Sequence, residues 1–129
     1  MTEIFKKLNF KNQDPILVLS APQSFQGELR EMAKLAGIHF APKKGSTYGF
    51  GIAFAPMKAD LLKAARALLS AVHEDAVLWF AYPKQTSKTY KSDLNRDSCW
   101  EALKPLGLQP NRQIAIDDDW SALRFKRMG

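Results

Sequence analysis

Cysteine is almost missing from this sequence, and the single Cys99 excludes an internal disulfide framework. Histidine is also scarce: only His39 and His73 occur, His39 has no metal-ligand residue types beside it, and no metal-ligand motif is present. We therefore expect no metal site and an inert, buried cysteine. No apolar run approaches the roughly 20 residues that cross a bilayer. The N-terminus lacks the apolar core of a signal peptide, so we expect a cytoplasmic protein without membrane contact.

Glycine is missing from the turn that follows the first apolar run, residues 16–19. That turn, residues 20–25, reads SAPQSF, and the first glycine comes only at Gly27. A backbone that lies closely against a nucleotide needs glycine at this turn. The glycines between residues 45 and 51 match neither the dinucleotide fingerprint nor the P-loop pattern. The sequence therefore predicts no bound cofactor, S-adenosylmethionine included.

Charge is not concentrated in any one part of the chain. The formal net charge is +6, but residues 1–82 carry 10 basic and 7 acidic residues and residues 83–129 carry 9 and 6. The basic tail or arm of many nucleic-acid-binding proteins is therefore missing. This distribution disfavours nucleic acid as a partner without excluding it. The length of 129 residues and the 46% hydrophobic content are those of one globular domain.

Short apolar runs alternate with helical periodicities along the chain, and they predict strands and helices respectively. Strands are expected at 16–19, 38–40, 50–55, 76–82, 113–116 and 120–125. Helices are expected at 20–36, 58–72 and 95–104, with a short helix in the extension 1–13. This order predicts a three-layer, Rossmann-like α/β domain over residues 1–129. Its sheet should be mainly parallel, with a C-terminal antiparallel hairpin.

Local signals set several of the expected boundaries. Ser20 and Gln23 stand at capping-box spacing, so the second helix should begin with Ser20 as its N-cap. Residues 73–75 are expected to form a turn before the strand 76–82, and residues 105–110 to form the exit from the last helix. From residue 50 onward the order resembles the later half of a class I methyltransferase fold, in which an antiparallel strand inserts into the sheet. That likeness concerns the fold and implies no chemistry.

The segment 83–97, PKQTSKTYKSDLNRD, carries the strongest chemical signal. It joins the carboxyl end of a buried strand to a helix N-terminus, where ligands and anions often bind. Lys84 would anchor a phosphate-bearing ligand, and Arg96 would offer a bidentate fork. The same stretch would also suit a solvated loop, in which Asp93 or Asn95 is the N-cap of the next helix and the acids Asp93 and Asp97 cap it and pair with Arg96 or a lysine. The candidate ligand-binding residues are Lys84, Ser87, Lys88, Lys91, Asp93, Arg96, Asp117, Trp120 and Ser121.

Three stretches together resemble an uncharacterised family of small bacterial α/β proteins, a domain of unknown function. They are LWFAYPK at 78–84, KSDLNRD at 91–97, and AID with DWSALRF between residues 115 and 125. The resemblance covers roughly residues 15–127 and implies a stand-alone bacterial domain. It brings no activity, cofactor or catalytic residue to this chain. It also draws attention to Trp120, which should lie near the carboxyl end of the strand 76–82.

The preferred hypothesis from the sequence is a noncatalytic binding or regulatory domain. It would recognise a small anionic ligand or partner at the segment 83–97, without any catalytic residue. One alternative is an enzyme with a degenerate methyltransferase-like fold, in which Asp93, Asp97 or Asp117 acts as a general base. Another alternative is a protein-interaction module, which would bind a protein partner in place of a small ligand.

Overall fold

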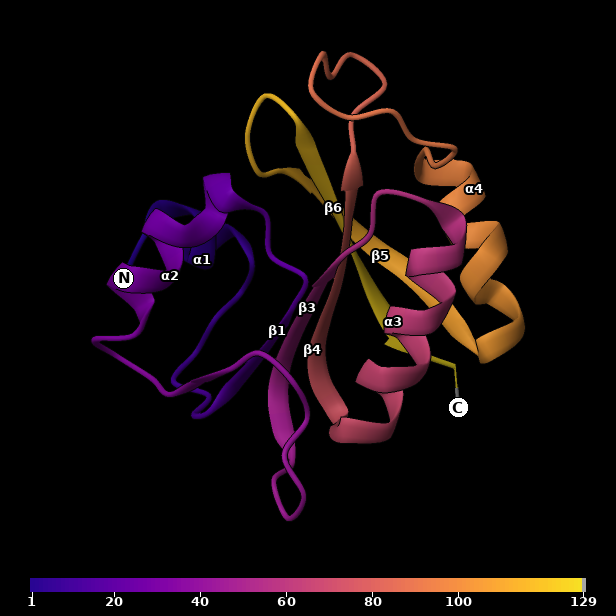
Figure 1. Ribbon diagram of the computed structural model, residues 1–129. Coiled ribbons are helices and arrows are strands. Elements are labelled where there is room, and N and C mark those ends of the chain that lie inside the picture. The colour runs from indigo at the N-terminus through magenta and orange to yellow at the C-terminus, as the bar shows by residue number, and fades with distance from the viewer. Residues whose placement is uncertain (129) are drawn as a thin grey trace.

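A computed structural model describes residues 1–128 and has a six-stranded sheet at its centre, in the order β2-β1-β3-β4-β6-β5 (Figure 1). Among these residues, no helix is both long and apolar enough to cross a bilayer. The strands are β1 (Ile16–Leu19), β2 (Ile38–His39), β3 (Tyr48–Phe54), β4 (Val72–Pro83), β5 (Leu108–Ala115) and β6 (Trp120–Arg127). The helices are α1 (Glu3–Lys7), α2 (Gln26–Met32), α3 (Lys58–Ala71) and α4 (Arg96–Leu103), with 3₁₀ turns at Gln23–Phe25 and Lys104–Leu106.

Two layers of helices cover the sheet because its central strands are apolar on both faces. Figure 1 shows α1 and α2 on one side of the sheet and α3 and α4 on the other. Alternate residues of β3, from Phe50 to Phe54, pack into one core with α1 and α2. Alternate residues of β4, from Leu78 to Tyr82, pack into a second core with α3 and α4. The three-layer, Rossmann-like architecture that the sequence predicts is confirmed.

The last strand completes the sheet as the sequence predicts. Strands β1 to β4 pair in parallel, and β6 lies antiparallel between β4 and β5. Its register pairs Tyr82 with Ser121 and Pro83 with Trp120. The start of β6 therefore lies against the carboxyl end of β4. This inserted antiparallel strand is the feature that the sequence shares with the later half of the methyltransferase fold.

The second helical segment begins later than the capping pattern predicts. Ser20 leaves β1 with a φ of 58°, in the left-handed region, whereas an N-cap residue needs an extended backbone. A 3₁₀ turn then forms at Gln23–Phe25, and α2 follows it and ends at Met32. The prediction of Ser20 as an N-cap is therefore wrong, since its backbone turns the chain at the end of the strand.

Two strands begin earlier than their apolar runs predict. β4 starts at Val72, so residues 73–75 belong to the strand and do not form a turn, and an irregular register near the start of β3 accommodates them. β5 starts at Leu108 and includes Pro110. A proline is tolerated there because β5 is the outermost strand of the sheet. In both places backbone pairing, and not hydropathy, sets the boundary.

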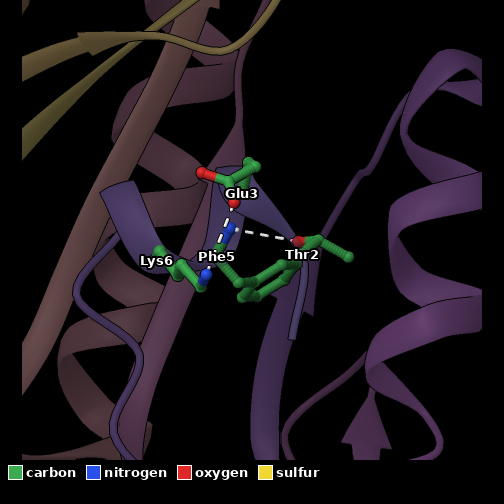
Figure 2. Close-up of polar contacts among 4 residues, drawn as sticks. All are labelled: Thr2, Glu3, Phe5 and Lys6. Carbon is green, nitrogen blue, oxygen red and sulfur yellow. Dashed lines mark hydrogen bonds and ion pairs between the residues drawn. The ribbon is translucent and has the colours of Figure 1, made fainter.

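Helix α1 places an aromatic anchor on one face of the sheet. Figure 2 shows its cap, in which Thr2 Oγ1 accepts a hydrogen bond from Phe5 N at 3.2 Å. Lys6 Nζ lies 3.4 Å from Glu3 Oε1 in an exposed ion pair on the same helix. The Phe5 side chain is fully buried, with its ring centroid 5.8 Å from that of Phe50. The cap thus holds the N-terminal segment against the central strand β3.

Two buried tryptophans differ in the fate of their indole N–H. Trp79 Nε1 donates to Leu8 O at 2.8 Å, whereas Trp120 Nε1 is buried without a hydrogen-bond partner in the described part of the chain.

Trp79→Phe should therefore destabilise the fold by about 1–2 kcal/mol more than Trp120→Phe, because it leaves a buried carbonyl unpaired. Urea unfolding followed by circular dichroism measures the difference. Equal losses in the two variants would contradict this role of the Trp79 bond.

Candidate functional site

The order of the strands creates a crevice beside β1 and β3. The chain passes from β1 outward to β2 and then returns to β3 on the other side of β1. At such a reversal the loops leave the carboxyl ends of the two strands in opposite directions, and ligands usually bind between them. A cleft of about 350 Å³, here called the β1–β3 cleft, lies at this place. Its lining residues are Leu19, Ser20, Phe40, Phe54, Pro56, Asp60, Lys63, Ala64 and Ala67.

The first half of α3 forms one wall of the β1–β3 cleft. Asp60, Lys63, Ala64 and Ala67 line it and recur at helical spacing, so they share one face of the helix. Asp60 Oδ2 accepts a hydrogen bond from Met57 N at 3.2 Å, which stabilises the start of the helix. The small alanine side chains leave space beside the strands. Lys63 adds a cation to this wall.

The other walls come from segments that are distant in the sequence. Leu19 and Ser20 lie at the end of β1, Phe54 and Pro56 lie at the end of β3, and Phe40 follows β2. Phe40 is 58% exposed. It also lines a second cavity, of about 290 Å³, against α2. The β1–β3 cleft therefore combines a mainly apolar surface with an exposed aromatic ring and a few charged groups.

The segment 83–97 is anchored at its start to the turn between β5 and β6. Lys84 N donates to Asp119 O at 2.7 Å, and Ser87 Oγ donates to Asp119 Oδ1 at 2.8 Å. Ser87 Oγ also accepts a hydrogen bond from Tyr90 N at 3.1 Å. The hydroxyl that the sequence suggests as a ligand donor is therefore engaged within the protein itself.

Further along, the segment 83–97 is joined to the turn before α3. Ser92 Oγ donates to Pro56 O, and Asp93 Oδ1 accepts from Lys58 N at 2.7 Å. Asp93 therefore stabilises the start of α3, whereas the N-cap of α4 is Asn95. Of the two predicted caps, Asn95 is confirmed and Asp93 is not, because the Asp93 carboxylate lies against an N–H of the neighbouring helix. The segment thus bridges two turns at the carboxyl edge of the sheet.

Three more candidate residues lie beside Lys84 at the ends of β4 and β6. Asp117 Oδ1 accepts a hydrogen bond from Trp120 N at 2.9 Å, so its carboxylate shapes the turn before β6. Trp120 is 2% exposed, and its ring packs edge-on against Tyr90 with the centroids 4.9 Å apart. Ser121 is 9% exposed within the strand. The structure brings these residues together, but mainly as parts of a packed turn.

The remaining candidate residues do not join this group. Lys88, Lys91 and Arg96 are exposed. Arg96 lines a separate cavity of about 320 Å³ with Asp97 and Trp100 of α4. The ion pairs within residues 1–128 lie elsewhere, one on α1 and one at the end of α2. Within the same residues, no cluster of three or more metal-ligand side chains occurs.

Burial controls two titratable groups between the sheet and α4. It raises the pKa of the Cys99 thiol to about 12. Burial is also the main reason why the pKa of the Tyr82 hydroxyl is raised to about 12, with Cys99 as a smaller cause. Tyr82 OH accepts a hydrogen bond from Gln113 Nε2 at 3.0 Å. Both groups are protonated at neutral pH, so Cys99 is a packing residue and not a nucleophile.

Comparison with known proteins identifies a class of fold. No family model and no curated protein sequence matches the chain. The N-methyltransferase NodS from Bradyrhizobium japonicum is similar in structure, with a TM-score of 0.63 at 9% identity, over 98% of this chain and 93% of that one. The ribosomal protein L11 methylase from Lactobacillus delbrueckii subsp. bulgaricus gives 0.60 at 11% identity, over 98% and 77%. An S-adenosylmethionine-dependent methyltransferase from Clostridium acetobutylicum gives 0.57 at 9% identity, over 96% and 87%. At such identities the likeness shows a methyltransferase-like α/β fold and no more.

These likenesses overturn the preferred hypothesis from the sequence. The hypothesis of a noncatalytic domain that recognises an anion at the segment 83–97 is wrong, because the three similar structures named above are methyltransferases. They favour the alternative, an enzyme with a degenerate methyltransferase-like fold. The contacts supply a physical reason, since the Ser87 hydroxyl and the Asp93 carboxylate are engaged by groups of the protein. Two of the polar groups that the sequence suggests for a ligand are therefore engaged within the protein.

The turn after β1 does not fit S-adenosylmethionine in the manner of a glycine-rich loop. Ser20 has the left-handed backbone that glycine adopts freely, but residues 20–22 all carry side chains and Pro22 has no N–H to donate. The residues present therefore do not form the usual site for this cofactor.

The β1–β3 cleft was not evident from the sequence because its residues come from four separate segments. The helical periodicity assigns Lys63 to the polar face of its helix, and Phe40 reads as the end of an edge strand. One signal was nonetheless available, because the first strand of a doubly wound sheet and the strand that returns beside it frame the switch point. That rule indicates the ends of β1 and β3, and not the end of β4.

Asp93→Ala should destabilise the protein by about 1 kcal/mol, because it removes the acceptor at the start of α3. Asp93→Asn keeps an acceptor oxygen and should cost clearly less. Arg96→Ala changes an exposed residue and should lie within about 0.5 kcal/mol of the wild type. Urea unfolding of the three variants provides the measurement. Similar values for Asp93→Ala and Asp93→Asn would show that the bond to Lys58 N is not the reason for any loss.

Raising the pH should destabilise the fold from about pH 9 upward. The pKa of Cys99 rises from 9.0 to about 12 and that of Tyr82 from 10.0 to about 12 on folding. The unfolded chain therefore releases these protons first, so the free energy of unfolding is unaffected below pH 9 and falls as the pH approaches 12. Urea unfolding between about pH 8 and pH 11 measures this fall. Cys99→Ala should reduce its slope, and an unchanged slope would exclude the thiol as a cause.

Proposed function

We propose that this chain is an enzyme domain that has diverged within the methyltransferase fold and that binds its small-molecule ligand in the β1–β3 cleft. The observation that carries the proposal is the cleft of about 350 Å³ at the strand reversal. Its volume lies in the usual range for small-molecule sites, which is about 300–1,000 Å³. The position is also the one at which open α/β sheets generally bind ligands.

The residues that line the cleft support a role for it in ligand binding and catalysis. Leu19, Phe54 and the alanines of α3 provide apolar walls that would exclude water from a bound ligand. Asp60 uses one carboxylate oxygen to accept from Met57 N, which leaves the other oxygen for a ligand or a proton. Asp60 lines the cleft and Asp93 and Asp117 do not, so Asp60 is the better candidate for a general base at this site.

We also infer that the chain belongs with the uncharacterised small bacterial proteins that its three motifs resemble, and that it acts in the cytoplasm. Two of the motifs support this inference by their positions. The stretch 78–84 forms the carboxyl half of β4, and the stretch 119–125 forms most of β6. These strands pair with each other over six residue pairs, so the two motifs describe one structural unit.

The proposal predicts that filling the cleft abolishes ligand binding. Ala64→Phe places a ring in the cleft, and Ala102→Phe enlarges a half-buried position on α4 outside it. A thermal-shift screen with S-adenosylmethionine, S-adenosylhomocysteine, adenosine and nucleoside monophosphates should yield a compound that raises the wild-type melting temperature by several degrees at saturation. Ala102→Phe should retain this response and Ala64→Phe should lose it.

Amide chemical-shift mapping of the same compound tests where it binds. The amides of Ser20, Phe40 and Lys63 should shift, because these residues line the cleft. Shifts confined to the segment 83–97 would contradict the proposal. An equal thermal response from Ala64→Phe and the wild type would contradict it as well, and so would a screen in which no compound binds.

A further inference from the structure

We infer that the β1–β3 cleft takes a nucleoside monophosphate, with the base stacked on Phe40 and the phosphate paired with Lys63. This inference rests on the proposed function and names the class of ligand for the same cleft. It assigns roles to two residues that are far apart in the sequence and line one hollow.

Phe40 provides a stacking surface that the fold leaves uncovered. It follows directly after the short edge strand β2 and is 58% exposed. A single exposed apolar residue would need no explanation. Phe40, however, lines both the β1–β3 cleft and the neighbouring cavity of about 290 Å³. A planar ring can therefore lie against it without displacing packed side chains, and stacking on a nucleobase is favourable for any base.

Lys63 supplies the positive charge of the cleft lining, and Asp60 supplies the negative charge. Its ammonium group takes part in neither of the ion pairs within residues 1–128. The acidic residue in the same wall, Asp60, already has one oxygen on Met57 N. The N–H of Lys58 at the start of α3 is likewise taken, by Asp93. Lys63 is thus the cationic donor in the described lining, and a phosphate oxygen is a strong acceptor for it.

The charge of the lining also distinguishes this ligand from the methyl donor. S-adenosylmethionine carries a positive sulfonium centre, which a lysine in the cleft would repel. A nucleoside monophosphate keeps the planar base for Phe40 and places negative charge where the cation is. The missing glycine turn agrees with this difference, because residues 20–22 restrict the approach of a ligand to the backbone after β1.

Isothermal titration with AMP and adenosine tests the inference on the full chain. AMP should bind the wild type about ten-fold more tightly than adenosine, because only AMP carries the group that Lys63 pairs with. Lys63→Gln should remove this advantage and leave adenosine binding unchanged. Arg66→Gln removes a neighbouring exposed cation of α3 that does not line the cleft, and it should keep the full advantage of AMP.

Variants of Phe40 test the stacking surface independently. Phe40→Ala should weaken AMP and adenosine equally, by about ten-fold, because both share the base. Phe40→Trp retains an aromatic surface and should bind both compounds at least as tightly as the wild type. An unequal effect of Phe40→Ala on the two compounds, or no effect, would overturn the role of this residue.

The outcomes separate this inference from the proposed function. If adenosine binds as tightly as AMP and Ala64→Phe abolishes both, the cleft is the ligand site but the phosphate assignment is wrong. If Arg30→Gln, in the neighbouring cavity, removes the advantage of AMP and Lys63→Gln does not, the phosphate lies on the other side of Phe40 and the inference is again wrong. If AMP binds Ala64→Phe as tightly as the wild type, both this inference and the proposed function are wrong.

Discussion

The close approach of α3 to β3 is the packing constraint on which the rest of the structure depends. Along β3, large residues face α1 and α2, whereas Gly51 and Ala53 face the opposite layer. A Cβ atom on Gly51 would lie 2.4 Å from a methyl carbon of Leu68, so a side chain at that position would force Leu68 of α3 to shift. This contact fixes the wall that carries Lys63. The core and the β1–β3 cleft therefore depend on the same alternation of large and small residues.

The sequence predicts the sheet well because its central strands are buried on both faces and read as short apolar runs. Ile16–Leu19 and the later hairpin follow this rule, and the insertion of β6 beside β4 was correctly anticipated. The failures occur where backbone geometry overrides composition. Ser20 has the residue type and spacing of an N-cap but adopts a left-handed φ. Residues 73–75 are polar, yet they lie within β4, in the register irregularity between the pairs Tyr48–Val72 and Phe50–Val77.

The cleft that we propose as the ligand site was not predicted from the sequence for a related reason. Basic and hydroxylic residues are concentrated in the segment 83–97, and composition cannot show that Ser87 and Asp93 are already engaged by Asp119 and Lys58. The β1–β3 cleft has no such concentration. Phe40 and Lys63 are brought together because β2 and β3 pair with opposite sides of β1, and this is a tertiary fact that a local pattern does not contain. Topology, and not residue type, indicates the cleft.

The backbone path of the turn after β1 is explained by packing, without a bound nucleotide. A non-glycine residue in the left-handed region costs about 1–2 kcal/mol, so Ser20 would not keep this backbone unless the path of the turn were needed. The path delivers Phe25 into the core, where its ring lies 4.9 Å from that of Phe54. Packing alone therefore accounts for the shape of the turn, and contact with a nucleotide backbone is not required. The binding that we propose in the cleft would instead use the exposed ring of Phe40, which follows β2, and the cation of Lys63 on α3.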